Sequence, residues 1–66
     1  MKLRDDLAII AGWIPPNSRV LDLGCGDGML LQWLCEKRNC RGYGVEISSE
    51  KVNQCINKNI NVIQAD

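Results

Sequence analysis

The apolar residues of the chain recur at helical spacing in some segments and form short continuous runs in others. A helix is expected over residues 3–13, where apolar positions four, three and four residues apart form one stripe: Leu3, Leu7, Ile10 and Ile14. Pro15 and Pro16 end this helix. Trp13 and Trp33 fall within helical patterns and are expected to pack in the core.

Five further elements are expected after the prolines. Strands are predicted in three short apolar runs bounded by turn residues: 19–23, 42–47 and 61–66. Helices are predicted over residues 29–39 and 48–59, and Ser48 or Ser49 can cap the second of them. Strands separated by helical patterns of this length form βαβ units, so we predict an α/β fold with a parallel sheet. Right-handed crossovers then place both connecting helices on one face of that sheet.

The loop between the first strand and the next helix is rich in glycine. It reads GCGDG from Gly24 to Gly28, and so many glycines indicate a backbone that a ligand approaches closely. Ligands bind such sheets at the carboxyl ends of the strands. Glu46 ends the second strand 22 positions after Gly24, where an acid meets the ribose of a bound nucleotide. Asp66, at the end of the third strand, is placed to accept from an adenine amino group.

A dinucleotide such as NAD is the competing ligand for this loop. Its fingerprint is GxGxxG, whereas the glycine spacing here is GxGxG. Asp22 and Asp27 would repel a pyrophosphate, although Asp27 can also cap the following helix. Loop amides are the expected donors to Asp22 if it is buried. S-adenosylmethionine carries an ammonium, a sulfonium and an adenosine, so it is the cofactor that these residues favour.

Length, charge and cysteine usage narrow the class of protein. The chain has 66 residues, enough for one small domain, and its eight Lys and Arg balance eight Asp and Glu. A neutral chain argues against a broad nucleic-acid or membrane surface, and no apolar run is long enough to span a bilayer. The N-terminus lacks the pattern of a signal peptide, so a soluble, cytoplasmic protein is expected. Four cysteines without a CxxC pair or a histidine predict no metal site. Disulfides would need an oxidising compartment, so without a signal peptide free thiols are expected instead.

Three segments of the sequence carry a family resemblance. VLDLGCGDG, GVEIS and IQAD resemble the first three motifs of class I S-adenosylmethionine-dependent methyltransferases. WIPPNSRVLDLGCGDGMLLQWL, RGYGVEIS and NINVIQAD resemble, more narrowly, the N-terminal part of the methionine-biosynthesis family MetW. The resemblance implies a Rossmann-like three-layer fold and no catalytic residue in this chain. The expected cofactor-binding residues are Asp22, Gly24, Cys25, Gly26, Glu46, Ile47 and Asp66. The Cys25 thiol is expected to pack rather than act as a nucleophile, because no histidine or other base accompanies it.

The chain departs from that family in its extent. It ends after the third predicted strand, whereas class I enzymes place acceptor-binding groups from the fourth strand onward. Residues 1–66 are therefore expected to be the N-terminal, cofactor-binding part of the domain and to be inactive when isolated. MetW proteins are associated with methionine synthesis, so a non-catalytic partner of a homoserine O-acyltransferase is the alternative. Self-association is expected through the strand at residues 19–23, which would lack a neighbour on one side.

Overall fold

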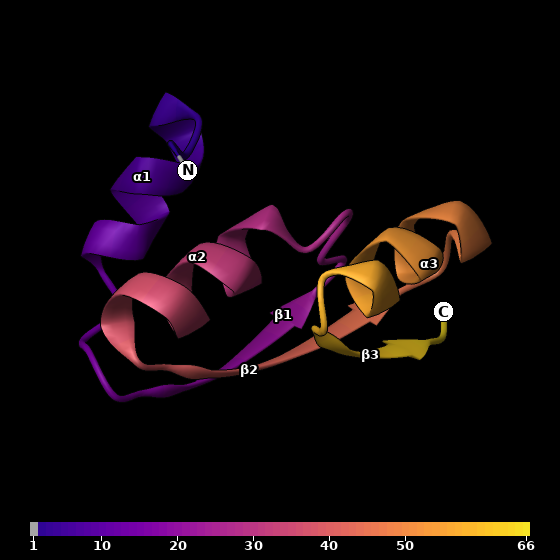
Figure 1. Ribbon diagram of the computed structural model, residues 1–66. Coiled ribbons are helices and arrows are strands. Elements are labelled where there is room, and N and C mark those ends of the chain that lie inside the picture. Colours follow the sequence, from indigo (N-terminus) through magenta and orange to yellow (C-terminus); the bar gives the residue numbers. More distant parts are fainter. Residues whose placement is uncertain (1) are drawn as a thin grey trace.

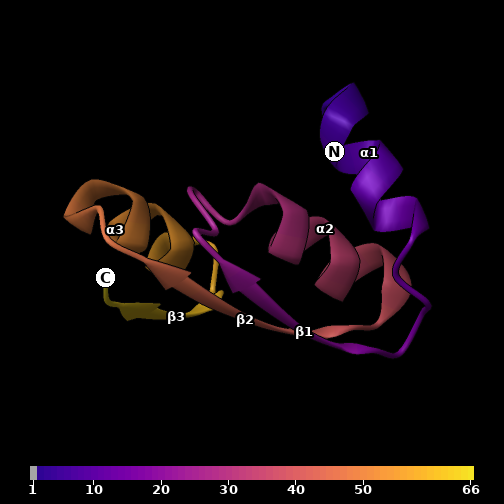
Figure 2. The same cartoon turned by 180° about the vertical axis from the view of Figure 1, so that it is seen from behind.

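Three parallel strands form one sheet, and every helix lies on the same side of it (Figures 1 and 2). The computed structural model describes residues 2–66. The elements follow in the order α1 (Asp5–Gly12), β1 (Arg19–Leu23), α2 (Met29–Arg38), β2 (Arg41–Glu46), α3 (Ser49–Asn57) and β3 (Asn61–Gln64). The strand order is β1-β2-β3. The predicted α/β fold, the parallel pairing and the common face of the crossover helices are confirmed.

Element boundaries differ from the sequence prediction by a few residues. The second helix stops at Arg38 because Asn39 turns into the left-handed region, with φ 55°. The third helix stops at Asn57, since Asn59 has φ 60°. The second strand runs from Arg41 to Glu46, so Ile47 lies beyond its end. Within residues 2–66, no helix is long and apolar enough to cross a membrane.

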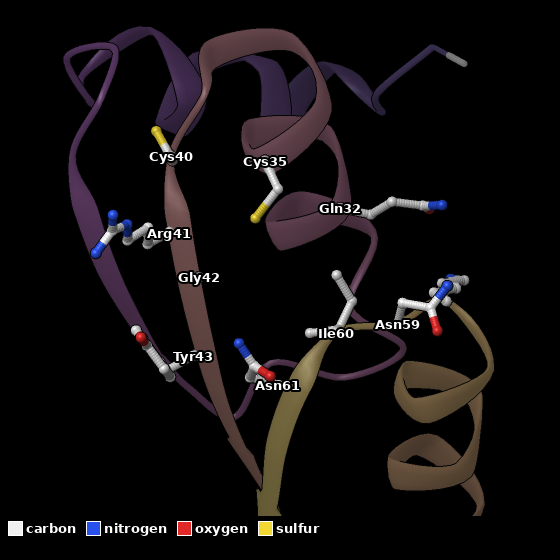
Figure 3. Close-up of a pocket in the computed structure, with 10 residues that line it drawn as sticks. Gln32, Cys35, Cys40, Arg41, Gly42, Tyr43, Asn59, Ile60 and Asn61 are labelled. Atoms are coloured by element: carbon white, nitrogen blue, oxygen red, sulfur yellow. The ribbon is translucent and has the colours of Figure 1, made fainter.

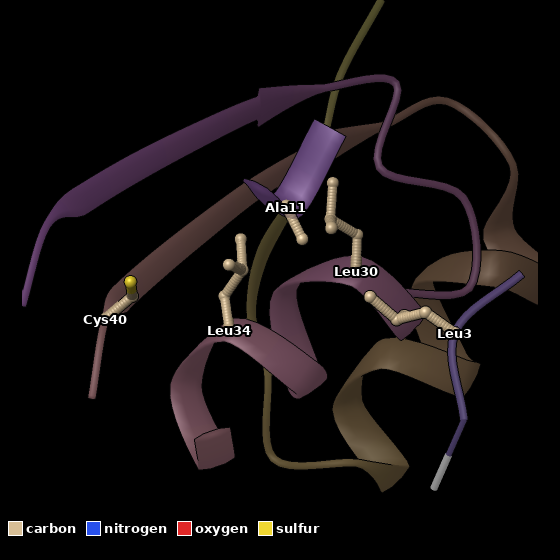
Figure 4. Packing of buried hydrophobic residues seen from close by; sticks show 5 residues of the cluster. All are labelled: Leu3, Ala11, Leu30, Leu34 and Cys40. Atoms are coloured by element: carbon tan, nitrogen blue, oxygen red, sulfur yellow. The ribbon is translucent and has the colours of Figure 1, made fainter. Parts of the chain in front are cut away.

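Two clusters of buried side chains fill the space between the helices and the sheet. One joins α1 to α2 and comprises Leu3, Ala11, Leu30, Leu34 and Cys40 (Figure 4). The other lies under the glycine loop and comprises Cys25, Leu31, Cys55 and Ile60. Glycine at position 44 permits this packing, because a Cβ there would lie 2.5 Å from the Cys25 sulfur. The glycine loop is thus tied to the core of the sheet.

The first helix buries less than its sequence pattern predicted. Leu3 and Leu7 pack as expected, but Ile10 is 37% exposed and Ala11 takes the buried position. The expectation that Trp13 lies in the core is wrong, because its side chain is 74% exposed. Trp33 does pack against the core, and the Arg38 guanidinium lies over its ring. The reason is that α1 packs mainly against α2, so only one side of α1 is covered.

The face of the sheet opposite the helices is apolar and open. Between about half and three quarters of each of four large apolar side chains on it is exposed: Leu21, Leu23, Tyr43 and Ile63. β1 is also an edge strand within residues 2–66, since it pairs with β2 alone. The predicted bare face and free edge are therefore present in the structure.

We predict that the 66-residue chain is not a stable monomer in dilute solution. Exposed apolar faces and unpaired strand edges drive association, so the chain should pair through β1 or pack loosely. Light scattering and a thermal unfolding curve test this. A monodisperse monomer with a sharp, cooperative transition would contradict it.

Candidate functional site

The glycine loop leaves β1 in a conformation that glycine adopts without strain. Gly24 has φ 76° and Gly26 has φ 60°, both in the left-handed region. The amides of Gly24 and Cys25 both donate to the carbonyl oxygen of Val45, at 2.7 and 3.1 Å. The start of the loop is therefore bonded to the neighbouring strand, while a Cβ at Gly24 or Gly26 would face open space. That open space is where a ligand can approach the backbone.

Glu46 holds this loop to the segment that follows β2. Its carboxylate accepts from the amide of Gly26 at 2.8 Å and from the amide of Ser48 at 3.0 Å. The bond from Ser48 has the larger effect and the bond from Gly26 the next. Together they hold the pKa of the Glu46 carboxyl group below its usual value, so the side chain is ionised at neutral pH. A carboxylate has about four lone-pair sites, so both oxygens can still accept from a ligand hydroxyl. Glu46 is 9% exposed and lies at the carboxyl end of β2, as predicted.

The third helix holds the loop from its other side. Lys58 donates to the carbonyl oxygen of Asp27 at 3.0 Å and lies 3.6 Å from its carboxylate. The Cys55 thiol donates to the carbonyl oxygen of Gly26 at 3.2 Å. The Asp27 carboxylate also accepts from the amide of Met29, the first residue of α2, at 3.1 Å, although the N-cap position of this helix is Gly28 rather than Asp27. Asp27 is thus partly neutralised, and the expected repulsion of a pyrophosphate rests mainly on Asp22.

Asp22 has a different environment from the one expected. Loop amides were its expected donors, but those of Gly24, Cys25 and Gly26 donate to Val45 and Glu46 instead. No hydrogen bond to the Asp22 carboxylate is formed within residues 2–66. Burial raises the pKa of this half-buried carboxyl group. A cation beside it would offset that effect of burial.

Cys25 packs inside the fold. It is 8% exposed, and its sulfur lies 3.9 Å from that of Cys55. Burial, and to a smaller extent the hydrogen bond with Cys55, raises the pKa of the Cys25 thiol to about 12. A thiol with so high a pKa is poorly suited to act as a nucleophile. All four cysteines are free thiols. The described part of the chain, residues 2–66, contains no group of three side chains suited to a metal ion.

Two hollows meet at Gly24, and together they include every predicted site residue. The first, about 290 Å³, lies over the strand ends, where its lining includes Gly24, Glu46, Ile47 and Asp66. The second, about 490 Å³, lies between α1, the loop and α3, where its lining includes Asp22, Gly24, Cys25 and Gly26. The site therefore has two compartments, one beside the Glu46 carboxylate and one beside Asp22.

Another hollow has no connection with these residues. It lies between α2 and the start of β3 and is lined mainly by amide-bearing, basic and thiol side chains (Figure 3). None of the seven predicted site residues lines it. The carboxyl ends of the strands, where the fold is expected to bind ligands, remain the candidate site.

Comparison with known proteins places this geometry in a class. A methyltransferase structure from Geobacter sulfurreducens, in complex with S-adenosyl-L-homocysteine, has a TM-score of 0.80 and 24% identity, over 97% of this chain and 30% of that one. A SAM-dependent methyltransferase from Archaeoglobus fulgidus has a TM-score of 0.74 and 31% identity, over 92% of this chain and 27% of that one. The protein thus has the fold of the class I methyltransferases.

The family follows from the sequence itself. Residues 4–66 match the family described as Methionine biosynthesis protein MetW, and the chain belongs to that family. A curated relative, a probable tRNA (uracil-O(2)-)-methyltransferase from Caenorhabditis briggsae, is 41% identical over 44 residues, which are 67% of this chain and 8% of the relative. The chain spans about a third or less of the methyltransferases compared here.

Three residues that hold the site were not predicted as part of it. The amide of Ser48 donates to Glu46, Lys58 bonds to Asp27, and Cys55 bonds to Gly26. Of the two predicted helix caps, Ser48 and Ser49, it is Ser48 whose hydroxyl accepts from the amide of Lys51, at 3.4 Å. No sequence signal marks Lys58 or Cys55, because their role depends on how α3 packs against the loop.

Proposed function

We propose that this chain binds S-adenosylmethionine and serves as the N-terminal, cofactor-binding part of a MetW-type methyltransferase domain. The observation that carries the proposal is the pair of hollows that meet at Gly24. One offers a hydroxyl-accepting carboxylate, Glu46, and the other a carboxylate without backbone donors, Asp22. A ligand with a nucleoside at one end and an amino acid at the other matches both.

The adenosine is proposed to occupy the hollow over the strand ends. Glu46 would accept from both ribose hydroxyls through the lone pairs that Gly26 and Ser48 leave free. Ile47, 62% exposed beside this hollow, offers an apolar surface to the adenine ring. Asp66 lines the same hollow and would accept from the adenine amino group.

The methionyl part is proposed to occupy the hollow beside Asp22. Its ammonium would lie near that carboxylate, which opposite charge favours and which would lower the raised pKa of Asp22. The left-handed backbone at Gly24 and Gly26 lets the ligand pass between the compartments without meeting a Cβ. Cys25 supplies packing beneath the loop rather than chemistry.

The methyl acceptor is not part of the proposal. Class I methyltransferases act by positioning an acceptor in line with the sulfonium, and the acceptor itself supplies the nucleophile. The family description supports a proposed link to methionine biosynthesis. A non-catalytic role beside a homoserine O-acyltransferase is the second candidate, supported by the exposed apolar face of the sheet, which a partner protein could cover.

Calorimetric titration with S-adenosyl-L-homocysteine and with NAD tests the cofactor. We expect saturable binding of the homocysteine compound and at least about tenfold weaker binding of NAD, because Asp22 opposes a pyrophosphate at the loop. Tighter binding of NAD would contradict the proposal and favour a dinucleotide-binding module. A pull-down with a homoserine O-acyltransferase tests the second candidate, and no retention of the enzyme would contradict it.

A further inference from the structure

Two arginines lie side by side at the end of the sheet remote from the glycine loop. Arg19 begins β1 and Arg41 begins β2, and the two residues are direct partners in the parallel register. Neighbouring strands are about 4.8 Å apart, so two side chains on the same face start within reach of one another. Both arginines are exposed. Like charges in this position repel, and an anion between them would remove that repulsion.

No carboxylate within the described part of the chain forms an ion pair with either arginine. The ion pairs within residues 2–66 join Arg4 to Asp6 and Lys58 to Asp27, and neither involves Arg19 or Arg41. Figure 3 shows the Arg41 side chain leaving β2 on the side away from Cys35 and Gln32. The guanidinium groups are therefore open to a ligand from solution.

A hollow of about 390 Å³ accompanies the arginines, and its rim is fixed by hydrogen bonds. It is lined by Asn17, Arg19, Asn39, Cys40 and Arg41, with no acidic residue among them. The side-chain NH₂ of Asn39 donates to the side-chain oxygen of Asn17 at 2.8 Å, and the backbone amide of Asn17 donates to the carbonyl oxygen of Arg38 at 2.9 Å. The two hydrogens of the Asn17 side-chain NH₂ group can donate to a ligand in the hollow. The Asn17 side chain is thus held in place before any ligand arrives, which reduces the cost of binding.

We propose that Arg19, Arg41 and Asn17 form a binding site for a phosphate group. A tetrahedral phosphate offers several oxygens and up to two negative charges, and can accept from two guanidinium forks at once. A carboxylate carries one charge and two oxygens, so it satisfies one fork. The ligand is a free phosphate ion or the phosphate of a small monoester, since both present the same group to the arginines.

This site is separate from the proposed cofactor site. Arg19 and Arg41 are the first residues of their strands, whereas Gly24 and Glu46 lie at or just beyond the carboxyl ends of the same strands. The two hollows of the proposed cofactor site share no lining residue with the hollow beside Arg19 and Arg41. Phosphate binding and cofactor binding can therefore be tested independently.

Nuclear magnetic resonance titration of the chain tests the phosphate site. Inorganic phosphate, glycerol 3-phosphate and acetate are added separately at constant ionic strength while the amides of Asn17, Arg19, Asn39 and Arg41 are followed. We expect saturable shifts with one or both phosphates and none with acetate. A response to glycerol 3-phosphate identifies a monoester as a ligand, and a response to inorganic phosphate alone identifies the free ion.

Arg41→Gln should lower phosphate affinity by at least about tenfold, because it removes one charged donor. Lys37→Gln, which removes an exposed charge on α2 outside the hollow, is the matched control and should leave the affinity unchanged. Affinity for S-adenosyl-L-homocysteine should be the same in the wild type, Arg41→Gln and Lys37→Gln. Equal shifts with acetate, no shift with either phosphate, or equal losses in both variants would overturn the proposal.

Discussion

Replacing Gly26 by valine is expected to abolish binding of S-adenosyl-L-homocysteine, with a loss of more than about a hundredfold in affinity. Gly26 has φ 60°, where a β-branched residue is strained by roughly 1–3 kcal/mol. A Cβ there would point into open space, the space that the ligand is proposed to enter. The loop must either move, which breaks the bond from the Gly26 amide to Glu46, or obstruct the ligand.

Calorimetry and circular dichroism on the same protein separate binding from folding. The sheet should survive in Gly26→Val, since nothing in the fold lies within 4 Å of the added Cβ. Gly12→Ala is the matched control, because a Cβ at Gly12 also meets nothing within 4 Å and the position is helical. Retained affinity in Gly26→Val with a normal spectrum would show that the loop does not touch the ligand.

Replacing Glu46 by glutamine is expected to weaken the same binding by at least about tenfold, because a charged acceptor of two hydroxyls is lost. Glutamine keeps one accepting oxygen and places an amide group against the amide of either Gly26 or Ser48. The substitution thus disturbs both the ribose contact and the bond that holds the loop. Circular dichroism should show the fold retained, and calorimetry measures the affinity.

Two substitutions serve as controls for Glu46→Gln. Asp27→Asn should have a much smaller effect, because an asparagine oxygen can still accept from Met29, and the half-exposed pair with Lys58 contributes little. Glu50→Gln removes a charge from the first turn of α3, outside both hollows, and should leave affinity unchanged. Equal affinities of the wild type and Glu46→Gln would remove Glu46 from the site.

The fold could be predicted from the sequence because its signals are local. Prolines at 15 and 16, the glycine loop and the alternation of short apolar runs with helical patterns determine the element order. The right-handed crossover rule then places α2 and α3 on one face. The positions of Gly24 and Glu46 at the strand ends follow from that topology alone.

Contacts between elements could not be predicted in the same way. Trp13 carries the pattern of a core residue, yet α1 has too few neighbours to bury it. The sequence gives no partner for the charge of Asp27, but the packing of α3 places Lys58, 31 positions further along the chain, beside it. The expected donors of Asp22 bond elsewhere because the loop folds against β2. Such pairings depend on three-dimensional packing, which periodicity and spacing do not encode.

The central claim is that one ligand occupies both hollows and crosses the loop at Gly24. Amide shifts on addition of S-adenosyl-L-homocysteine, compared with those caused by adenosine alone, test it most directly. We expect adenosine to shift the amides of Glu46 and Ile47, at the strand ends, and the whole compound to shift those of Asp22 and Gly26 as well. Saturable shifts confined to the amino ends of the strands, or no shifts at Gly26 and Glu46 at saturation, would contradict it.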